Sequence, residues 1–441
     1  MSDRSIAIVG SGISGLSAAW HLSGNNKIFL FEKGDRLGGH THTHVFNTER
    51  KPFFVDSGFI VFNKVNYPNF TSWIRELNVK ESPSEMSFSV SRAGGNFEWG
   101  GSSVFSVFGQ KRNLVSPKFL KMLLEVVKFN KLAKKFLQKE NVYQYENNLA
   151  RFLSENNFSQ FFVRNYLAPM AGSIWSTPES KITDYPTISI LRFFDNHGLL
   201  SVSNHHQWFH LSDGSSSYIK YLFNHDKFRK KEIKVLKNHR VDYVEPMQNE
   251  QEGPKVSLQI KNLEQKENYT MKVDDVIFAC HANETLQCLN DSRPEFPLLK
   301  RIRFQKNVGY LHSDKRLMPK RKSVWSSWNY LSGEDNSYDD NISVTYWMNK
   351  LQDLETSQNI FVSLNPFIEP RESSFKKKLV YEHPVFDQDM IDAREKLQKI
   401  QGLDHIWHSG AWTGNGFHED GFVSGKQVAA KINSKTNKLK C

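Results

Sequence analysis

A glycine-rich segment near the N-terminus has the residue types and the spacing of a site for a nucleotide diphosphate. Residues 10–15 follow the pattern G-x-G-x-x-G, with Gly10, Gly12 and Gly15 at its three fixed positions. The first glycine permits a tight turn, the second lets a diphosphate approach the backbone, and the third lets a helix pack closely on a strand. Glu32 lies about 20 residues further on, where a carboxylate would accept hydrogen bonds from ribose hydroxyl groups.

The elements around this segment must hold it against the diphosphate, and their patterns predict a β-α-β unit. Ser5–Val9 and Lys27–Glu32 are short apolar runs typical of strands, and Ile13–Leu22 between them reads as a helix. A helix that begins directly after the glycine turn presents its free N–H groups and partial positive charge to the anion. The sequence therefore predicts dinucleotide binding where the first strand ends.

The stretch from Glu32 to His40 narrows the choice of cofactor. With Arg36 and the pair Gly38-Gly39, it resembles the ExxxRxGGR segment of the amine oxidase and phytoene desaturase superfamily of flavoproteins. In that superfamily the arginine and the paired glycines wrap the diphosphate and the approach to the flavin. The last position here is His40 instead of arginine. The resemblance implies that the cofactor is FAD.

Two later segments extend the resemblance over the whole chain. Val235–Val244, followed by residues 274–280, resembles a strand pair in which a backbone group, here at Val241, meets the adenine. Residues 408–425 resemble the segment whose helix N-terminus faces the flavin ring, with Ala411 in place of the acid that usually binds the ribityl hydroxyls. The residues expected to bind the cofactor are therefore Gly10, Ser11, Gly12, Ile13, Ser14, Gly15, Glu32, Lys33, Arg36, Gly38, Gly39, His40, Thr41, Gly58, Phe59, Val241, Gly410, Ala411, Gly421, Phe422 and Val423.

Several short stretches resemble one subgroup of these flavoproteins. This subgroup is often encoded beside cyclopropane-fatty-acid-synthase-like methyltransferases and is fused to them in plants. The stretches are residues 38–43, 55–63, 66–69, 86–90, 173–176 and 416–421. The resemblance implies an oxidoreductase that acts on unsaturated or methylated fatty acyl chains, within phospholipids, by hydride transfer to flavin N5. Desaturation and double-bond isomerisation are both open, and such a methyltransferase is an expected partner.

The same resemblance suggests four catalytic residues, each with a structural alternative. Phe417 occupies a position where amine oxidases often place an aromatic wall beside the flavin. His418 and Glu419 would act on the substrate or tune the flavin, but acids in the first turn of a helix are also favoured by its dipole. Lys306 aligns loosely with a lysine that contacts flavin N5 through water, and a surface lysine is its alternative.

Histidines and cysteines do not predict a metal site. His40, His42 and His44 would share one side of a strand, but no acid or cysteine lies close to them in the sequence. The three cysteines of the chain form neither a zinc pattern nor a disulfide framework, which fits a reducing cytoplasm. The N-terminus lacks the features of a signal peptide, and no run of about 18 apolar residues occurs.

Composition leaves two interpretations of the aromatic content. Aromatic residues make up 13% of the 441 residues, with 33 Phe and 10 Trp, and they could line a large apolar cavity or simply fill the cores. The net charge of +11 could serve solubility or an anionic surface. No motif for nucleic acid accompanies this charge, so a nucleic-acid partner is not expected.

Residues 116–140 predict the clearest long helix of the chain. Ser116 is suited to the N-cap and Pro117 to the first helical position, and apolar residues alternate with seven lysines over the following turns. A basic amphipathic helix can lie on an anionic membrane surface, although it can equally pack on its own core. A cytoplasmic protein that binds the inner face of the membrane is one expectation from this pattern.

The remaining patterns predict an α/β protein, α+β overall, with two parts. A discontinuous Rossmann-like FAD domain would comprise residues 1–80, 205–300 and 400–441, and a mostly antiparallel sheet with helices would form a substrate domain from residues 81–204 and 301–399. Expected strands include 52–63, a hairpin at 86–99, a meander over 232–245, 255–262 and 269–272, and strands at 274–279, 308–312, 343–347 and 406–409. Expected helices are 158–170, ending near Pro169, and 181–200, 388–401 and 421–432.

Two other functions remain open on this sequence. A flavin amine oxidase is the first, and an aromatic cage at the flavin with a lysine–water contact would support it. The second is an accessory protein that carries FAD and presents lipid to the methyltransferase. An apolar tunnel long enough for an acyl chain would favour a lipid substrate.

Overall fold

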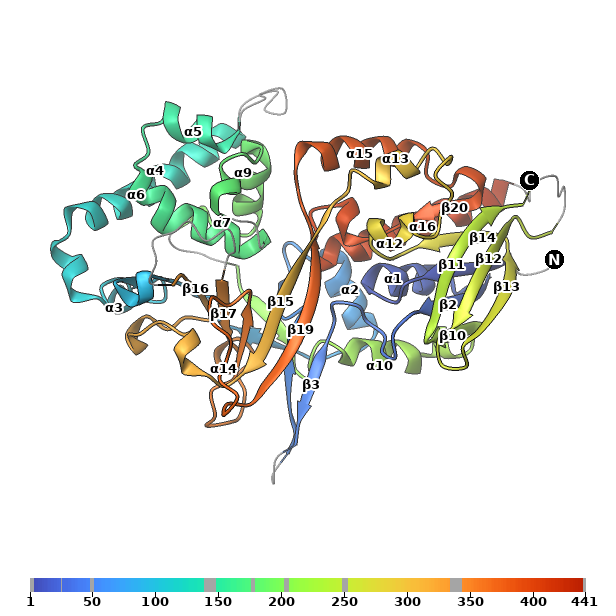
Figure 1. The fold of residues 1–441 in the computed structure, drawn as a ribbon, viewed down its shortest axis with the longest axis horizontal. Helices are drawn as coiled ribbons and strands as arrows, with labels where there is room; N and C mark the ends of the chain where they lie inside the picture. The colour runs from blue at the N-terminus through green and yellow to red at the C-terminus, as the bar shows by residue number, and fades with distance from the viewer. Residues whose placement is uncertain are drawn as a thin grey trace.

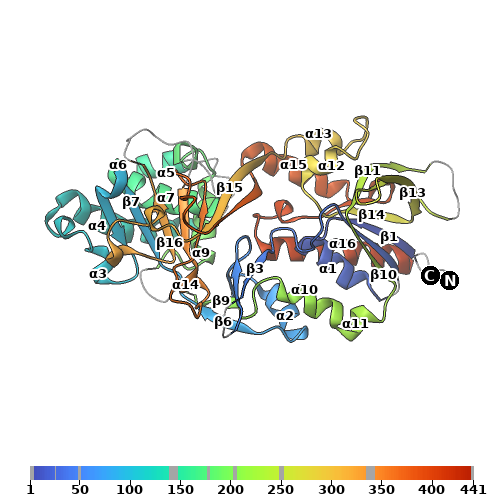
Figure 2. The ribbon, with the colours of Figure 1, turned by 60° about the horizontal axis from the view of Figure 1, so that its bottom comes forward.

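The computed structural model describes residues 4–24, 26–47, 51–138, 148–175, 179–201, 206–247, 253–333 and 343–438. Both termini lie at one end of an elongated molecule, beside a parallel sheet, and the helices from α3 to α9 lie at the other end (Figures 1 and 2). The fold is mixed α/β, as the sequence predicts. None of the described helices has the length and apolar character needed to cross a membrane.

A five-stranded parallel sheet forms the end near the termini. Its order is β10-β2-β1-β14-β20, and every neighbouring pair is parallel. Helices α1 and α16 pack on each other beside it (Figure 1), so closely that a Cβ on Gly425 would lie 2.2 Å from the Ser14 carbonyl oxygen. The elements of this layer are β1 (Arg4–Val9), α1 (Ile13–Leu22), β2 (Asn26–Glu32), β10 (Ile233–Lys237), β14 (Asp275–Phe278), β20 (Ile406–His408) and α16 (His418–Lys438).

A three-stranded antiparallel meander adjoins this sheet, formed by β11 (His239–Pro246), β12 (Val256–Asn262) and β13 (Glu267–Val273). The expectation that residues 232–245 form one strand of the meander is wrong. Asn238 has a φ of 57°, a left-handed conformation that ends β10 before β11 begins. The first half of the segment therefore joins the parallel sheet, next to β2.

A seven-stranded sheet forms the middle of the molecule. Its order is β19-β15-β18-β17-β16-β7-β8, antiparallel except for the parallel pair β16 and β7. The predicted hairpin and the strands at 308–312 and 343–347 are confirmed within it. Its strands are β7 (Phe88–Arg92), β8 (Phe97–Gly100), β15 (Phe304–His312), β16 (Trp328–Leu331), β17 (Ser343–Trp347), β18 (Phe361–Leu364) and β19 (Lys376–Pro384).

Helices cover this sheet at the end far from the termini (Figure 1). The long predicted helix is confirmed as α4 (Pro117–Leu137), and the Ser116 hydroxyl oxygen accepts a hydrogen bond from the Phe119 N–H at 3.3 Å as its N-cap. The other helices here are α3 (Val104–Val107), α5 (Leu149–Glu155), α6 (Gln160–Phe162), a π-helix (Val163–Leu167), α7 (Ala168–Trp175), α8 (Glu179–Ile182) and α9 (Thr187–Asn196).

Two helix predictions in this region are wrong. The helix over 158–170 does not end near Pro169, because the chain passes through the π-helix and continues as α7. Pro169 is then the second residue of α7, inside a continuous helix, and the carbonyl oxygens that its missing N–H leaves free, those of Arg164 and Asn165, accept hydrogen bonds from the side chains of Arg92 and Trp99. The segment 181–200 is not one helix, because Pro186 separates α8 from α9 and serves as the N-cap residue of α9.

Smaller elements connect the two large sheets. The predicted strand region 52–63 contains β4, which pairs with β3, and β5, which pairs with β9. The last helix begins at His418, three residues earlier than predicted.

The remaining elements are β3 (Thr43–Phe46), β4 (Phe53–Asp56), β5 (Phe62–Asn63), α2 (Pro68–Glu76), β6 (Glu81–Ser84), β9 (Trp208–Leu211), α10 (Ser217–Asn224), α11 (Asp226–Arg229), α12 (Ala282–Leu286), α13 (Phe296–Leu299), α14 (Met348–Leu351) and α15 (Gln388–Lys399). Short 3-10 turns lie at Ala93–Gly95, Lys111–Val115, Lys315–Leu317, Lys322–Val324, Leu403–His405 and Ala411–Thr413. The division into two domains stays a prediction.

Candidate functional site

A large cavity connects the parallel sheet with the seven-stranded sheet and the helices beyond it. Its volume is about 1650 Å³, which exceeds the roughly 300–1,000 Å³ of a pocket for one small ligand. The glycine turn before α1 lines one part of it, and side chains of α4, α7 and α9 line another. The cavity can therefore hold a dinucleotide and a second molecule.

The glycine turn at the start of α1 has the geometry of a diphosphate cradle. Gly10 has a φ of 105° and donates its N–H to the Phe31 carbonyl oxygen at 2.9 Å, which fixes the turn. A Cβ added to Gly12 would meet nothing within 4 Å, whereas one added to Gly15 would lie 2.0 Å from the Gly10 carbonyl oxygen. Gly12 thus faces open space and Gly15 faces the backbone, as a bound diphosphate requires.

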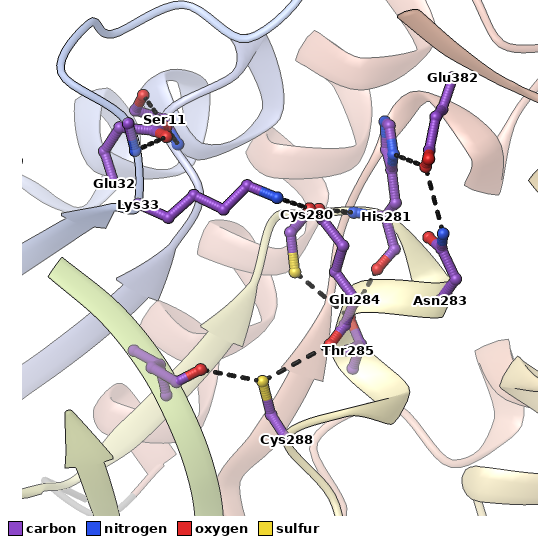
Figure 3. A network of polar contacts seen from close by, with 12 residues as sticks. Ser11, Glu32, Lys33, Cys280, His281, Asn283, Glu284, Thr285, Cys288 and Glu382 are labelled. Atoms are coloured by element: carbon purple, nitrogen blue, oxygen red, sulfur yellow. Dashed lines mark hydrogen bonds and ion pairs between the residues drawn. The ribbon is translucent and has the colours of Figure 1, made fainter. Parts of the chain in front are cut away.

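Glu32 lies at the end of β2, close to this turn (Figure 3). Its Oε2 accepts hydrogen bonds from the Ser11 hydroxyl at 2.5 Å and the Ser11 N–H at 3.2 Å, and its Oε1 accepts one from the Gly34 N–H at 2.9 Å. Lys33 forms an ion pair with Glu284 of α12 beside it. These contacts hold the Glu32 carboxylate at the cavity wall, in position for ribose hydroxyl groups.

Arg36 stabilises the loop that faces the cradle. Its guanidinium group donates hydrogen bonds to the carbonyl oxygens of Thr41, at 3.0 Å, and Gly39, at 2.7 Å. Gly39 has a φ of 58°, and a Cβ on it would lie 3.2 Å from the Cα of Gly12. The loop therefore approaches the glycine turn as closely as a glycine backbone allows.

Three histidines and a tyrosine surround the middle of the cavity. The ring of His40 lies 5.8 Å from His281, 5.3 Å from Tyr381 and 5.6 Å from His383, measured between centroids. Burial and the neighbouring histidines lower the pKa of His40 well below its usual range, and burial lowers that of His383 to about 4. The Nε2 of His40 is buried without a hydrogen-bond partner in the described part of the chain. It is a polar group available to a bound molecule.

His42 and His44 lie apart from this group. Their rings are 4.1 Å from each other, and His44 contacts Ser57 at 2.8 Å and Lys377 at 3.3 Å. Among the described residues, no group of three or more histidine, cysteine or acidic side chains is arranged to hold a metal ion. The structure thus gives His44 a hydrogen-bonding role, and His42 packs its ring against that of His44.

The segment before α16 forms a further part of the cavity wall, next to the start of α1. Gly410, Ala411, Trp412, Phe417 and His418 line the cavity there. The ring of Phe417 stacks on Phe193 of α9, with centroids 4.9 Å apart. Phe417 therefore links the region expected for the flavin to the aromatic side chains of the helices.

His418, the first residue of α16, is a buried residue of the cavity wall. The hydroxyl group of Tyr218 lies 3.2 Å from its Nε2 and 2.8 Å from the hydroxyl of Thr41. Burial lowers the pKa of His418 to about 3, so the imidazole is neutral at pH 7. A neutral imidazole at the cavity wall can donate or accept one proton in a hydrogen bond.

Beyond Phe417 the cavity is lined mostly by apolar side chains. They come from the seven-stranded sheet and from α4, α7 and α9, and they belong to one hydrophobic cluster. They include Phe88, Trp99, Met122, Leu123, Val126, Met170, Ile174, Phe193, Trp328 and Tyr346. We call this part of the cavity the apolar arm.

A family model for flavin-containing amine oxidoreductases matches residues 13–362. The chain belongs to this family. It is therefore an FAD-dependent oxidoreductase, and the predicted cofactor is confirmed. No curated protein in the comparison matches the sequence significantly.

Solved structures of the same fold cover almost the whole enzyme. A putative protoporphyrinogen oxidase from Exiguobacterium sp. 255-15 has a TM-score of 0.65 and 14% identity, covering 99% of this chain and 100% of its own. A fatty acid isomerase from P. acnes, described as CLA-producing, has a TM-score of 0.66 and 13% identity, covering 98% and 99%. A cyclohexylamine oxidase from Brevibacterium oxydans IH-35A has a TM-score of 0.66 and 14% identity, covering 99% and 100%. At these identities the likeness shows the fold of this flavoprotein oxidoreductase, and its substrate is a separate question.

Most residues expected to bind FAD lie at the cavity. Those that line it are Gly10, Ser11, Gly12, Ile13, Ser14, Glu32, Lys33, Arg36, Gly38, Gly39, His40, Gly58, Phe59, Val241, Gly410 and Ala411. Two others, Gly15 and Gly421, support the wall from behind, and a Cβ on Gly421 would lie 2.7 Å from the side chain of Ile13.

Three further residues of that prediction are placed away from the cavity surface. The Thr41 hydroxyl contacts Tyr218, and Phe422 is buried against Trp73 with ring centroids 5.0 Å apart. Val423 is half-buried on α16. Their side chains pack within the protein, so a contact with FAD would come from their backbone groups, and the expectation stays a prediction for these three residues.

Two of the four predicted catalytic residues do not lie at the cavity surface. Lys306 on β15 is exposed and does not line the cavity, so the structure corrects the expectation of a lysine at flavin N5. Glu419 accepts hydrogen bonds from the Asn69 and Phe70 N–H groups, at 3.0 and 2.9 Å, and caps α2. Phe417 and His418 do line the cavity.

Sequence reasoning missed His281, Tyr381 and His383. Tyr381 and His383 are two residues apart on β19 and both line the cavity, so an alternating pattern was present in the sequence. The basic run that begins β19 hides it, because three successive lysines are atypical of a strand. No local signal connects these residues with His40, which reaches them only through the fold.

Proposed function

We propose that this FAD-dependent oxidoreductase acts on an unsaturated or methylated fatty acyl chain, as a desaturase or a double-bond isomerase. The apolar arm is the observation that carries this proposal. A flexible hydrocarbon chain offers only dispersion contacts and apolar area, and the arm presents aromatic, Met, Leu, Ile and Val side chains to it. The similarity of the fold to a fatty acid isomerase is consistent with this choice.

The junction of the two parts of the cavity determines where the reacting carbon would lie. Phe417 belongs to the wall built by the segment before α16, and through Phe193 it also belongs to the lining of the arm. A chain that extends along the arm would therefore place a carbon next to a double bond beside Phe417. The enclosing rings exclude water from that carbon, which protects a hydride transfer from side reactions.

FAD, when bound, supplies a hydride acceptor at N5. Desaturation also requires that a proton leave the neighbouring carbon, and a general base for it works best with a pKa near the pH of the reaction. His383 and His418 line the cavity, but their pKa values are lowered to about 4 and about 3, which makes both weak bases, so we assign neither as the base. Isomerisation needs no net loss of a proton, because the hydride returns to the chain at another carbon.

An amine oxidase is the second candidate, and one carboxylate favours it. Glu85 lines the cavity and could pair with a substrate ammonium group. However, Glu85 already lies 3.2 Å from Lys350, and its carboxylate accepts hydrogen bonds from Ser87 and Ser327. The exposed position of Lys306 also removes the lysine expected of such an enzyme. We therefore place the acyl chain first.

Anaerobic mixing tests the proposal. The purified holoenzyme is mixed with free unsaturated fatty acids, with phospholipids that carry the same chains, and with a panel of primary amines, while the visible flavin band is followed. Bleaching by lipid and a new double bond in the recovered lipid, seen by mass spectrometry, support desaturation. A shifted double bond without net bleaching supports isomerisation. Bleaching by amines alone would contradict the proposal and establish the second candidate.

A further inference from the structure

The end of the molecule formed by α3, α4 and the turn between them exposes an unusual number of apolar side chains. Half of the large apolar residues that are exposed in the described part of the chain lie within residues 104–127. Phe105 is 89% exposed, Val115 80% and Leu124 73%. We call this surface the docking surface; it comprises Val104, Phe105, Leu114, Val115, Leu120, Leu124 and Val127. An exposed apolar group of this kind marks an interaction site on a folded protein.

The elements that carry the docking surface adjoin one another. Phe108, directly after α3, packs its ring against Phe119 in the first turn of α4, with centroids 6.0 Å apart. Figures 1 and 2 both place α3 and α4 at the end of the molecule opposite the two termini. The surface therefore lies far from the glycine turn and projects away from the FAD-binding sheet.

The exposed charges within residues 101–138, the segment that carries the docking surface, have one sign. Lysine and arginine side chains at eight positions between 111 and 135 are exposed there. Glu125 is the one acid within residues 101–138, and it is buried, accepting hydrogen bonds from the hydroxyl and N–H groups of Ser159 at 2.6 and 2.8 Å. The cations are Lys111, Arg112, Lys118, Lys121, Lys128, Lys131, Lys134 and Lys135.

We propose that the docking surface binds the headgroup region of an anionic lipid bilayer. Apolar side chains flanked by lysines are suited to a membrane interface, because the rings and aliphatic groups enter the acyl boundary while the cations meet lipid phosphates. A second copy of the chain fits poorly, since two such surfaces would repel each other. Protein partners also fit less well, because lysine is depleted from protein–protein interfaces.

The docking surface is continuous with the wall of the apolar arm. On α4, Leu120, Leu123 and Val127 follow one another at spacings of three and four residues, so they share one stripe of the helix. Leu120 and Val127 are exposed, whereas Leu123 lines the cavity. A bilayer on this surface would therefore lie against the helix that forms the side of the arm.

Vesicle co-sedimentation of the full-length holoenzyme tests this inference. Phosphatidylcholine vesicles are compared with vesicles that contain roughly one-third phosphatidylglycerol, at about 0.1 and about 0.5 M salt. We expect binding to the anionic vesicles only, weakened at least about tenfold by the higher salt. Equal binding to both vesicle types, or no binding at low salt, would overturn the inference. Vesicle binding is measured without any catalytic turnover, so the result does not depend on the substrate proposed above.

Matched variants separate this surface from the overall charge of the protein. Lys118→Glu with Lys121→Glu is expected to lower vesicle binding about tenfold or more. Lys396→Glu with Lys399→Glu makes the same charge change at the same spacing on α15 and should alter binding by less than about twofold. Equal losses from both pairs would show non-specific charge attraction and would contradict the proposal.

A second pair tests the apolar contribution. Phe105→Ser with Leu124→Ser should lower vesicle binding about tenfold, while Val65→Ser with Leu403→Ser, exposed elsewhere, should change it little. Each variant is first checked for an unchanged flavin spectrum and unfolding temperature. A concentration-dependent dimer that the Phe105 and Leu124 substitutions abolish, together with unchanged vesicle binding, would assign the surface to a second copy of the chain instead.

Discussion

The imidazole ring of His418 lies flat against the phenyl ring of Phe59, with centroids 3.7 Å apart and an angle of 6° between the planes. The hydroxyl of Tyr218 is its polar neighbour, at 3.2 Å. A proton added to His418 would place a charge in this enclosure, which is why its pKa falls to about 3. His408 in β20 is in a similar position, because burial and the charge of Arg293 lower its pKa to about 3.

These buried histidines predict an acid-sensitive fold. In the unfolded chain a histidine titrates near pH 6.5, so the stabilisation is complete above that pH. It is lost as the pH falls towards 3, because the unfolded state takes up protons that the folded state does not. Each such histidine contributes roughly 1.4 kcal/mol per pH unit in this range.

Urea unfolding at pH 7.5, 6.5 and 5.5 measures the effect. We expect the free energy of unfolding to fall steeply below pH 6.5 in the unmodified protein and less steeply in His418→Gln. His239→Gln, which changes a partly exposed histidine, serves as the control and should keep the original slope. Identical slopes for all three proteins would show that His418 is not held neutral by its surroundings.

The two glycines of the turn before α1 predict opposite outcomes for the same substitution. In Gly12→Ala the new methyl group would enter open space at the cradle, so the apoprotein should fold normally while the dissociation constant of FAD rises about tenfold or more. In Gly15→Ala the methyl group would lie 2.0 Å from a carbonyl oxygen, and the fold itself should lose roughly 3 kcal/mol.

Thermal unfolding of the apoproteins and equilibrium dialysis with FAD distinguish these effects. The prediction requires that Gly12→Ala melt at the original temperature and bind FAD weakly. Unchanged FAD affinity in Gly12→Ala would mean that the diphosphate does not lie against this residue.

The sequence predicts the glycine turn because everything it needs is local. The turn, the helix that follows and the acid of β2 lie within about 30 consecutive residues, so their spacing alone indicates the β-α-β unit. The enclosure of His418 is different, because Phe59, Tyr218 and His418 come from distant parts of the chain. No spacing rule connects such residues, and only the packed fold brings them together.

Prolines explain why the helices of the apolar arm were harder to predict. A proline usually ends a helix because it removes a needed N–H, but Pro169 follows directly on a π-helix and the helix continues through it. The carbonyl oxygens of Arg164 and Asn165, in the preceding turn, accept hydrogen bonds from the side chains of Arg92 and Trp99 instead. Pro186, in contrast, separates α8 from α9, which is the effect expected of a proline. The apolar arm depends on the continuous helix at Pro169 and on the break at Pro186, because Met170 and Ile174 of α7 and Phe193 of α9 line it.

The position of Lys306 predicts that replacing it has little effect on the rate of flavin reduction. It is exposed on β15 and does not line the cavity, so Lys306→Met should change the rate of flavin reduction by any substrate by less than about twofold. Stopped-flow measurement under anaerobic conditions gives this rate directly. A hundredfold lower rate of flavin reduction in Lys306→Met would restore the interpretation of Lys306 as a residue acting at flavin N5. It would also strengthen the case for an amine substrate.

Val126 and Val127 of α4 allow a direct test of the apolar arm. They are neighbours in the sequence, but Val126 lines the cavity, whereas Val127 is 56% exposed. In Val126→Trp the larger ring would occupy the arm, so kcat/KM should fall about tenfold or more for long fatty acids and little for short ones. Val127→Trp adds the same ring outside the cavity and should leave the chain-length profile unchanged.

Free fatty acids of increasing length, below the concentration at which they form micelles, provide the series. With free substrates in solution, the membrane contact proposed for Val127 does not enter the measurement. Because a filled arm excludes only the part of the chain that extends beyond the new ring, the dependence on length is the decisive result. A uniform loss for every length in Val126→Trp would indicate a general distortion, and equal losses in both variants would show that acyl chains do not bind along α4.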